Sequence, residues 1–537
     1  MKLKTIRDVD IDDKCVILRV AFDLPIDTAK ELLTAERISD DSRIRDVLPT
    51  IKHLVEKNCR VVVAAGWLGR PKGADPDLSM APAVIRLQEL MEEDNCLRHP
   101  VLMAPNALDG SSPRSVNKNR AEVKQITSQL KPGQLCVLEN VRYDPEANAD
   151  DQDFARFIAD LGGHGAVYVN EAEAQNHRPE ATIVSTPRYV VSNGGQAVFG
   201  LRYPEIVRHM GSLSHGLEDE NRGSFVLFLS GKKIETDPGI TSKISVTNAL
   251  MDKMRAGDTL VVGGAVVYTF LVAQEFLGRI KGNLDSAGSI IDLYNKTLAG
   301  EVKAIKEDGK PDASRRASDR EAQVQKSKSD KLLAILGITP GDIRGLIGDS
   351  YMRWGQEGEQ TVFAARVILK ANDKGIQLML AEDHVIADKA PDKGGYLPKG
   401  CRAVVHGRAA GIPAGWLGIA PGPRSVASIC SRVRDAGIVL LAGPLSIEDP
   451  RAEGLSHVHE MVLQAIGEAK GSGGTTIAGG GDTTAVINRF GSRGSFTAVS
   501  NAGGATLELI EKGTLPGIEA ITVAGSLRKG GLRKGSI

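Results

Sequence analysis

The sequence has few aromatic residues and no excess of either charge. Phenylalanine, tryptophan and tyrosine make up 4% of the 537 residues, too few for a platform on which single-stranded bases stack. The 67 basic and 67 acidic side chains give a formal net charge of +0 at pH 7, so no global field draws the chain onto nucleic acid or an acidic membrane. We therefore expect neither partner, and any anion site must be local.

Signals of secretion are also missing. The six cysteines are widely spaced and form no CxxC pair, which favours reduced thiols in a cytosol-like compartment. Residues 1–8 lack the apolar core of a secretory signal, and no apolar run reaches membrane-spanning length. We therefore expect a cytoplasmic protein. What is present, 42% hydrophobic and 25% charged residues, is typical of folded globular domains.

Short apolar runs alternate with longer amphipathic stretches, a pattern typical of α/β folds. We expect buried strands at residues 15–20, 61–65, 135–138 and 166–169, and a second series at 225–229, 259–262, 378–380, 403–405, 439–441, 476–478 and 496–499. Residues 43–58 carry apolar side chains at helical spacing. Parallel strands with crossover helices bury such runs on both faces. The sequence predicts an α/β fold of two doubly wound parallel-sheet lobes.

The boundaries of these lobes can be placed approximately. We expect an N-terminal lobe at 1–190, a hinge with an interdomain helix at 191–216, a C-terminal lobe at 217–520 and a tail at 521–537. An insertion at about 282–359 interrupts the second lobe. Its middle part, 303–331, is dense in charge and poor in aromatic residues, which favours a solvated segment and a possible protein contact. We expect a monomer.

Two glycine-rich turns stand out in the second half. Gly480, Gly481, Asp482 and Thr483 follow one apolar run, and Gly503 with Gly504 follows the next. Each turn looks like a strand end that opens into a helix, which gathers backbone N–H groups suited to phosphate oxygens. The Asp482 carboxylate and the Thr483 hydroxyl suit a phosphate-bound Mg²⁺. Neither run fits the P-loop or dinucleotide fingerprints, but a nucleotide is the predicted ligand.

Four arginines of the first half lie where α/β sheets bind ligands. Arg70, Arg142 and Arg178 each follow a predicted strand, and Arg43 stands at the start of a helix. Guanidinium groups bind phosphate and carboxylate with two hydrogen bonds, so the four predict a cradle for a small, doubly anionic substrate. Each arginine alone is better explained as a solvated surface charge.

In the second half, lysines follow the predicted strand at 225–229. Lys233 comes after a glycine at the strand end, and Lys243 follows a short polar loop. Either could place a mobile charge near a nucleotide phosphate, or lie on the surface.

The order of these motifs resembles that of the phosphoglycerate kinase family over most of the chain. The segments that carry the resemblance are Arg19-Val20-Ala21-Phe22-Asp23-Leu24-Pro25, Asp41-Ser42-Arg43-Ile44-Arg45, Leu68-Gly69-Arg70-Pro71, Leu138-Glu139-Asn140-Val141-Arg142-Tyr143, Gly263-Gly264-Ala265, Gly415-Trp416-Leu417-Gly418, Gly479-Gly480-Gly481-Asp482-Thr483 and Leu507-Glu508-Leu509. Each is weak alone, but their collinear order argues against chance.

The resemblance implies two Rossmann-like lobes joined by a hinge. It implies reversible phosphoryl transfer between 1,3-bisphosphoglycerate and Mg-ADP, which gives 3-phosphoglycerate and ATP in glycolysis after hinge closure. It implies that the transferring group is stabilised by Arg43, Lys233, Gly480 and Gly503. It places the substrate on Asp23, Arg43, Arg70, Arg142 and Arg178. It places the nucleotide on Lys233, Lys243, Gly263, Gly264, Asp449, Gly480, Gly481, Asp482 and Thr483, with Mg²⁺ on Asp482.

The chain departs from the family pattern mainly in the substrate pocket. Ala21 and Asp23 replace an acid and an amide, Trp67 replaces a histidine, and Glu180 replaces a second histidine. Added acids weaken anion binding unless they face away or pair with arginines. Two alternatives therefore stay open: a kinase of the same fold with a different small-acid substrate, and a non-catalytic relative that serves in binding or assembly.

Overall fold

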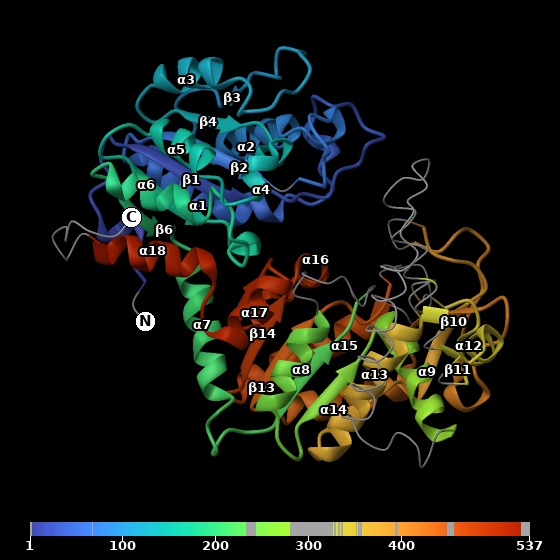
Figure 1. Ribbon diagram of the computed structural model, residues 1–537. Helices are drawn as coiled ribbons and strands as arrows, with labels where there is room; N and C mark the ends of the chain where they lie inside the picture. Colours follow the sequence, from blue (N-terminus) through green and yellow to red (C-terminus); the bar gives the residue numbers. More distant parts are fainter. Residues whose placement is uncertain are drawn as a thin grey trace, which may run out of the picture. The chain divides into compact units, whose positions relative to one another are not determined.

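The computed structural model describes residues 3–66, 68–231, 243–279, 326, 329–330, 333–334, 337–350, 352, 357–392, 396–447 and 456–527. The chain divides into two compact units (Figure 1). Unit 1 consists of Met1–Ser212 together with the carboxyl-terminal segment from Glu508, and unit 2 consists of Leu213–Leu507.

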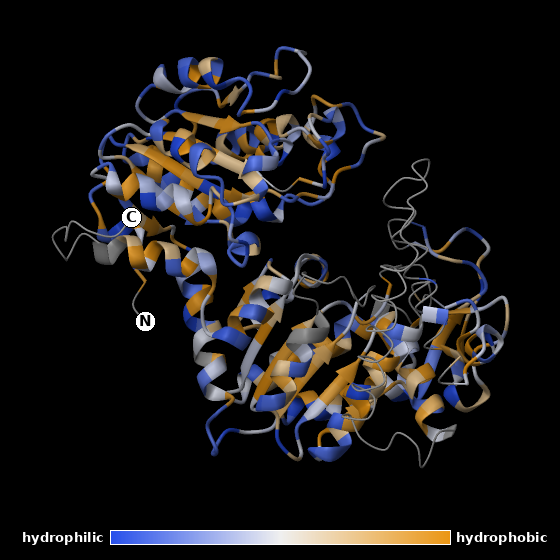
Figure 2. Cartoon of the chain, in the orientation of Figure 1, coloured by the Kyte–Doolittle hydropathy of each residue, from blue (hydrophilic) through white to orange (hydrophobic). Residues whose placement is uncertain are grey.

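Unit 1 is built on a parallel sheet of six strands in the order β3-β4-β2-β1-β5-β6. The strands are β1 Cys15–Ala21, β2 Arg60–Gly66, β3 Leu102–Ala104, β4 Leu135–Leu138, β5 Val167–Glu171 and β6 Gln196–Phe199. The central strands are buried almost throughout, which explains their continuous apolar runs. Figure 2 shows these strands as hydrophobic segments between helices of mixed hydropathy.

Helices cover the unit 1 sheet. They are α1 Ser42–Glu56, α2 Ala81–Glu93, α3 Arg120–Ser128, α4 Pro145–Asn148, α5 Gln152–Asp160, α6 Ser185–Ser192 and, from the end of the chain, α18 Pro516–Leu527. Helix α1 buries the apolar stripe that was read from the sequence, including Ile44, Ile51 and Leu54. Helix α1 begins at Ser42, so Arg43 lies in its first turn.

Unit 2 contains a second parallel sheet of six strands in the order β15-β14-β13-β7-β8-β9. The strands are β7 Phe225–Leu229, β8 Thr259–Val262, β9 Gln377–Met379, β13 Ile438–Ala442, β14 Thr475–Gly479 and β15 Ala498–Ser500. The helices are α8 Lys243–Lys253, α9 Val266–Arg279, α12 Pro340–Ile347, α13 Glu357–Asp373, α14 Pro423–Arg434, α15 Ser456–Gly471 and α16 Gly481–Arg489. The predicted fold of two doubly wound lobes is confirmed.

One strand predicted for the second parallel sheet lies in a separate antiparallel sheet. The run at 403–405 was expected in the parallel series, but it lies in β11 Ala403–Gly407 of a small antiparallel sheet with β10 Asp383–Ala387 and β12 Leu417–Pro421. Val404 and Val405 are 46% and 57% exposed. Two adjacent valines favour a strand, but nothing local shows which sheet the strand joins.

The unit boundaries also differ from the predicted ones. Helix α7 Tyr203–Gly216 lies in the segment expected to hold an interdomain helix, and the division falls within it. Residues 508–520, which we assigned to the second lobe, group with unit 1, as does helix α18. The physical reason is that α18 packs on α6 and β6, where Ala520 joins an apolar cluster with Ala21 and Ile183. Helix α17 Gly504–Lys512 crosses this second division.

Candidate active site

A basic pocket lies at the carboxyl ends of the unit 1 strands. It has a volume of about 390 Å³, and Arg70, Arg142 and Arg178 line it together with Asn148 and Glu180. The three arginines come from the loops after β2, β4 and β5, which are far apart in the sequence. Parallel strands bring these loops to one edge of the sheet. Of the four arginines predicted to converge, Arg70, Arg142 and Arg178 line this pocket and Arg43 does not.

The charges in this pocket act on one another. Burial lowers the pKa of Arg142, and Arg70 and Arg178 lower it further, whereas Glu180 and Asp23 raise it. Like charges held this close repel each other, and an anionic ligand would relieve that repulsion. Arg142 is positioned from both sides, because its guanidinium donates to Gly69 O and its Nε donates to Asn148 Oδ1 at 3.2 Å.

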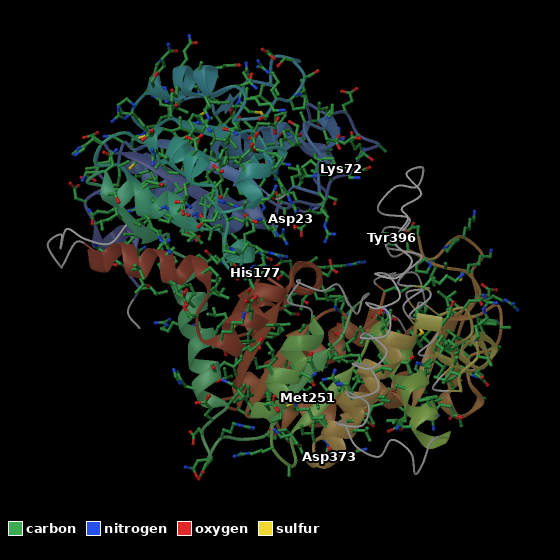
Figure 3. All side chains as sticks on the ribbon, viewed as in Figure 1. Asp23, Lys72, His177, Met251, Asp373 and Tyr396 are labelled. Atoms are coloured by element: carbon green, nitrogen blue, oxygen red, sulfur yellow. The ribbon has the colours of Figure 1, made fainter. Side chains whose placement is uncertain are left out.

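Arg43 and Asp23 form an ion pair beside the pocket. Arg43 Nη1 lies 3.2 Å from Asp23 Oδ2 and also donates to the backbone carbonyl of Asp23. Asp23, labelled in Figure 3, follows the end of β1, and Arg43 lies in the first turn of α1. Their side chains are 51% and 18% exposed, so a ligand can reach this pair.

Glu180 lines the pocket and also lies beside a buried arginine. Arg19 in β1 is fully buried; its Nε donates to Thr182 Oγ1 at 2.9 Å and its Nη2 lies 3.8 Å from Glu180 Oε2. The Glu180 side chain is 5% exposed. Burying the Arg19 cation without a carboxylate would be costly, so Glu180 balances its charge. The acid that departs from the family pattern therefore has a structural partner.

A buried acid and amide hold the pocket loops in place. The Glu139 carboxylate accepts hydrogen bonds from Ser79 Oγ and Met80 N at 2.8 Å, and burial raises the pKa of Glu139 to about 7. Asn140 Nδ2 donates to Leu68 O at 2.9 Å. Together they fasten the loop after β2, which carries Arg70, to the loop after β4, which carries Arg142. We did not single out Glu139 or Asn140 for this role from the sequence, although both stand in a matched motif.

In unit 2 the two glycine turns meet. Gly480 has a φ of +113°, caps helix α16 and donates its N–H to Ser500 O at 3.0 Å. A Cβ atom added to Gly480 would lie 3.8 Å from the Cα atom of Gly503. The first amides of α16 are therefore open beside the second turn, as an anion site requires.

Thr483 differs from our expectation. Its side chain is buried, its hydroxyl donates to Gly479 O at 3.0 Å, and it accepts from Gly443 N at 2.9 Å. The hydroxyl thus joins the loops after β13 and β14 and is not available to a phosphate-bound metal. By contrast, Asp482 is exposed at the second position of α16.

Gly263 and Gly264 lie in a tight crossing of three loops. Gly264 has a φ of +58°, and a Cβ atom there would lie 2.6 Å from Gly231 N. A Cβ atom at Gly263 would lie 2.3 Å from the side chain of Leu445. Both glycines line a narrow apolar pocket at the carboxyl end of β8, with Met379 among its other walls. Only glycine permits the backbone to form this wall.

A single carboxylate fits what Mg²⁺ needs at a nucleotide site. In the described part of the chain, no three His, Cys, Asp or Glu side chains gather as a metal site. Mg²⁺ usually takes one or two protein carboxylates and completes its shell with water and substrate phosphates. Exposed Asp482 beside open helix amides satisfies this requirement. Lys233, Asp449 and Trp67 lie outside the described residues, and of Lys243 only the backbone, at the first position of α8, is described.

Comparison with known proteins shows the family of this chain. The family model described as phosphoglycerate kinase matches residues 6–321 and 344–513. The phosphoglycerate kinase of Chloroflexus aggregans is 30% identical over 524 residues, 97% of this chain and 99% of that protein. That of Chlorobium limicola is also 30% identical over 524 residues, 97% of this chain and 100% of that protein.

Solved structures show the same fold. The phosphoglycerate kinase of Coxiella burnetii matches with a TM-score of 0.57 at 22% identity, over 98% of this chain and 100% of that one. The enzyme of Pyrococcus horikoshii matches with a TM-score of 0.62 at 17% identity, over the same shares. The chain therefore belongs to the phosphoglycerate kinase family, and it is a phosphotransferase whose acceptor is a carboxyl group.

Proposed function

We propose that this chain transfers a phosphoryl group reversibly between 1,3-bisphosphoglycerate and ADP through the residues described above. The observation that carries the proposal is the convergence of Arg70, Arg142 and Arg178 on one pocket of unit 1. These guanidinium groups would bind the phosphate and carboxylate of 3-phosphoglycerate. Arg43 would stabilise the charge on the transferring group from the same unit.

The nucleotide would bind to unit 2. Its phosphates would meet the amides of Gly481 and Gly503, while Gly480, whose own N–H is bonded to Ser500 O, would shape the turn. Its base would lie against the wall that Gly263 and Gly264 form. Asp482 would hold Mg²⁺, which when bound neutralises charge on the nucleotide phosphates.

Three expected residues complete the proposed nucleotide site. Lys233 would act on the transferring group, Lys243 on a phosphate, and Asp449 on the ribose. Closure of the two units about a hinge near α7 would exclude water from the transfer.

The pairing of the two unusual acids favours this reaction over a kinase with a changed substrate. Glu180 is balanced by Arg19, and Asp23 is paired with Arg43, so neither adds an isolated negative charge to the anion pocket. This pairing supports the proposal that Arg70, Arg142 and Arg178 hold 3-phosphoglycerate.

A coupled assay with 3-phosphoglycerate and Mg-ATP tests the proposal. We expect turnover by the unaltered chain and a loss of about 10² or more in kcat for Arg43→Ala, because a charge that acts on the transition state is removed. Arg45→Ala is the matched control, since Arg45 lies on the same helix but its side chain is 52% exposed and pairs with Asp41.

The outcomes separate the alternatives. Full activity of Arg43→Ala would remove Arg43 from the mechanism. Nucleotide binding by the unaltered chain without turnover of 3-phosphoglycerate would indicate a different small acid as substrate. Absence of nucleotide binding would indicate a binding or assembly protein.

The setting of the reaction is part of the proposal. All six cysteines are free thiols, and no helix in the part of the chain that the structure describes has the length and apolarity to cross a membrane. We infer a monomer in the cytoplasm, where thiols stay reduced.

A further inference from the structure

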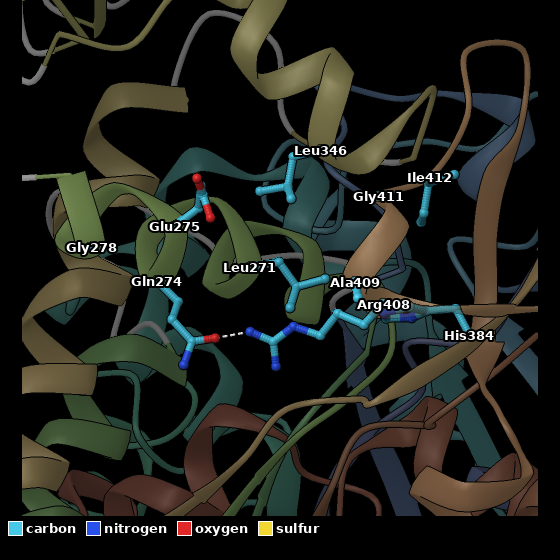
Figure 4. Close-up of a pocket in the computed structure, with 10 residues that line it drawn as sticks. All are labelled: Leu271, Gln274, Glu275, Gly278, Leu346, His384, Arg408, Ala409, Gly411 and Ile412. Atoms are coloured by element: carbon cyan, nitrogen blue, oxygen red, sulfur yellow. Dashed lines mark hydrogen bonds between the residues drawn. The ribbon is translucent and has the colours of Figure 1, made fainter.

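A cavity of about 520 Å³ lies in unit 2, lined by residues outside both proposed substrate sites (Figure 4). Its walls come from α9, α12, the buried strand β10 and the turn that follows β11. Figure 4 shows Arg408 crossing the cavity toward α9, where its guanidinium donates to Gln274 Oε1. No residue that we assign to phosphoryl transfer lines this cavity.

The cavity contains a partly desolvated cation. Burial lowers the pKa of Arg408, whereas Glu275 and Glu382 raise it. Among the described residues, no carboxylate forms an ion pair with this guanidinium, and Gln274 is its side-chain partner. A partly exposed guanidinium whose side-chain partner among the described residues is a neutral amide can still gain charge-assisted hydrogen bonds from a carboxylate ligand.

A buried histidine adds a second polar group. His384 is 1% exposed, and neither ring nitrogen has a hydrogen-bond partner among the described residues. Burial lowers the pKa of His384 to about 4, so the ring is neutral and offers one donor and one acceptor. Its ring points toward Arg408 in Figure 4. Buried polar groups normally have partners, so this histidine indicates a site that a ligand or its bound water completes.

The remaining walls define the rest of the ligand. Leu271, Leu346 and Ile412 line the cavity with aliphatic surface, and Glu275 lines it from α9. A simple anion would bind Arg408 but would be repelled by Glu275 and Glu382, and an amine would leave the guanidinium unbalanced. A ligand with both charges and an aliphatic body matches all three features.

We propose that this cavity binds the zwitterion of an aliphatic α-amino acid. Its carboxylate would lie on Arg408, its ammonium group toward Glu275, and its side chain against Leu271, Leu346 and Ile412. His384 would bond the carboxylate directly or through one water.

Calorimetric titration of the full chain with L-leucine, isocaproate and isoamylamine tests this proposal. Isocaproate lacks the ammonium group, and isoamylamine lacks the carboxylate. We expect saturable binding of L-leucine and binding of each analogue at least about tenfold weaker, because each loses one charge-assisted contact. Absence of saturable L-leucine binding at about 10 mM, the weak limit of ordinary ligand affinities, would overturn the proposal. Analogues that bind as tightly as L-leucine would overturn it as well.

Two variants locate the site. Arg408→Gln should weaken L-leucine binding at least about tenfold. Arg402→Gln should not, because Arg402 lies in the same small sheet region but is 73% exposed and pairs with Asp388. Both variants should keep phosphotransferase turnover, which verifies their folding. Unchanged L-leucine affinity in Arg408→Gln would place the ligand elsewhere and overturn the assignment. The comparison of the three ligands on the unaltered chain decides the proposal even where a variant does not fold.

Discussion

At the residue scale, acids that depart from the family pattern are matched by arginines already in unit 1. Glu180 lies beside the buried guanidinium of Arg19, and Asp23 pairs with Arg43. The neighbouring Ala21, which replaces a family acid, packs in an apolar cluster with Ala172 and Ile183. Against the family pattern, one acid is lost at position 21 and two are gained at positions 23 and 180, and each gained acid lies beside an arginine.

Removing the acid at position 180 should cost stability. Glu180→Gln leaves the Arg19 cation buried without a carboxylate, and we expect the free energy of unfolding to fall by about 3 kcal/mol. The KM for 3-phosphoglycerate should fall at the same time, because a negative charge beside Arg142 is gone. Urea unfolding and steady-state kinetics measure the two effects. The control is Glu205→Gln, whose side chain is 66% exposed. Equal stability of both variants would contradict the role of the Arg19 pair.

Glu171 should make stability depend on pH. Burial raises its pKa from 4.5 to about 7, and the hydrogen bond from Thr50 and the charge of Arg202 oppose this shift. The folded state therefore binds the proton more tightly than the unfolded state. The stabilisation from protonated Glu171 is complete below pH 4.5 and is lost as pH rises to about 7. The free energy of unfolding changes by about 3 kcal/mol over this range.

Glu171→Gln isolates this effect. The difference in unfolding free energy between the variant and the unaltered chain should shift in favour of the variant between pH 4.5 and 7 and stay constant above that range. Urea unfolding across this range gives the difference. His177, whose pKa burial lowers to about 4, has the opposite pH dependence but is present in both proteins and cancels. A difference that does not vary with pH would show that Glu171 is ionised when folded.

At the element scale, function depends on how strands end. β14 ends at Gly479, and the next residue, Gly480, has a positive φ, which lets helix α16 begin at once and leaves its first amides open. The loop after β8 crosses the loop after β7 so closely that Gly264 has no room for a side chain. These contacts place the phosphate and base regions of the proposed nucleotide site at one sheet edge.

Gly480→Ala should weaken nucleotide binding. A φ of +113° strains an L residue, although the added Cβ would lie at an ordinary contact distance of 3.4 Å from Thr483 Oγ1, so the strain acts on the backbone of the turn. We expect Mg-ADP affinity to fall about tenfold or more and stability by about 1–3 kcal/mol. Gly473→Ala, with a φ of +94° and open space around its Cβ, is the control. It should lose stability alone. Equal loss of affinity in both variants would indicate a global effect.

At the scale of the whole molecule, unit 1 is completed by the end of the chain. Helix α18 buries Ile518, Ala520 and Ile521, and Gly517 N donates to Asn176 O at 3.0 Å. An added Cβ at Gly517 would lie 2.0 Å from Asn176 Oδ1. Asn176 stands two positions before Arg178, so the last described helix supports a loop of the basic pocket.

Truncation after Leu515 tests this support. Without α18 we expect the melting temperature of unit 1 to fall by more than about 10 °C, because several buried aliphatic side chains lose their contacts. The transition of unit 2 should stay in place. Calorimetry follows both transitions, and titration with 3-phosphoglycerate should show weaker binding. A lowered unit 2 transition with an unchanged unit 1 would contradict the division of the chain.

Much of this protein could be predicted from local patterns. Buried parallel strands carry continuous apolar runs, so most strands of the two parallel sheets were found. Ligands bind beyond the carboxyl ends of such strands, so Arg70, Arg142 and Arg178 were recognised. The strands β3 and β6, at two edges of the unit 1 sheet, were not predicted.

The amino-acid sequence by itself determined the two α/β lobes, the arginine set and the glycine turns, since each depends on residue type and spacing along the chain. Tertiary structure decided which charges meet. Glu180 became the partner of Arg19 across a separation of 161 residues, Thr483 turned its hydroxyl inward to Gly443, and α18 joined unit 1. Those outcomes follow from packing and from the cost of burying an unbalanced charge, which act between segments that the linear order leaves far apart.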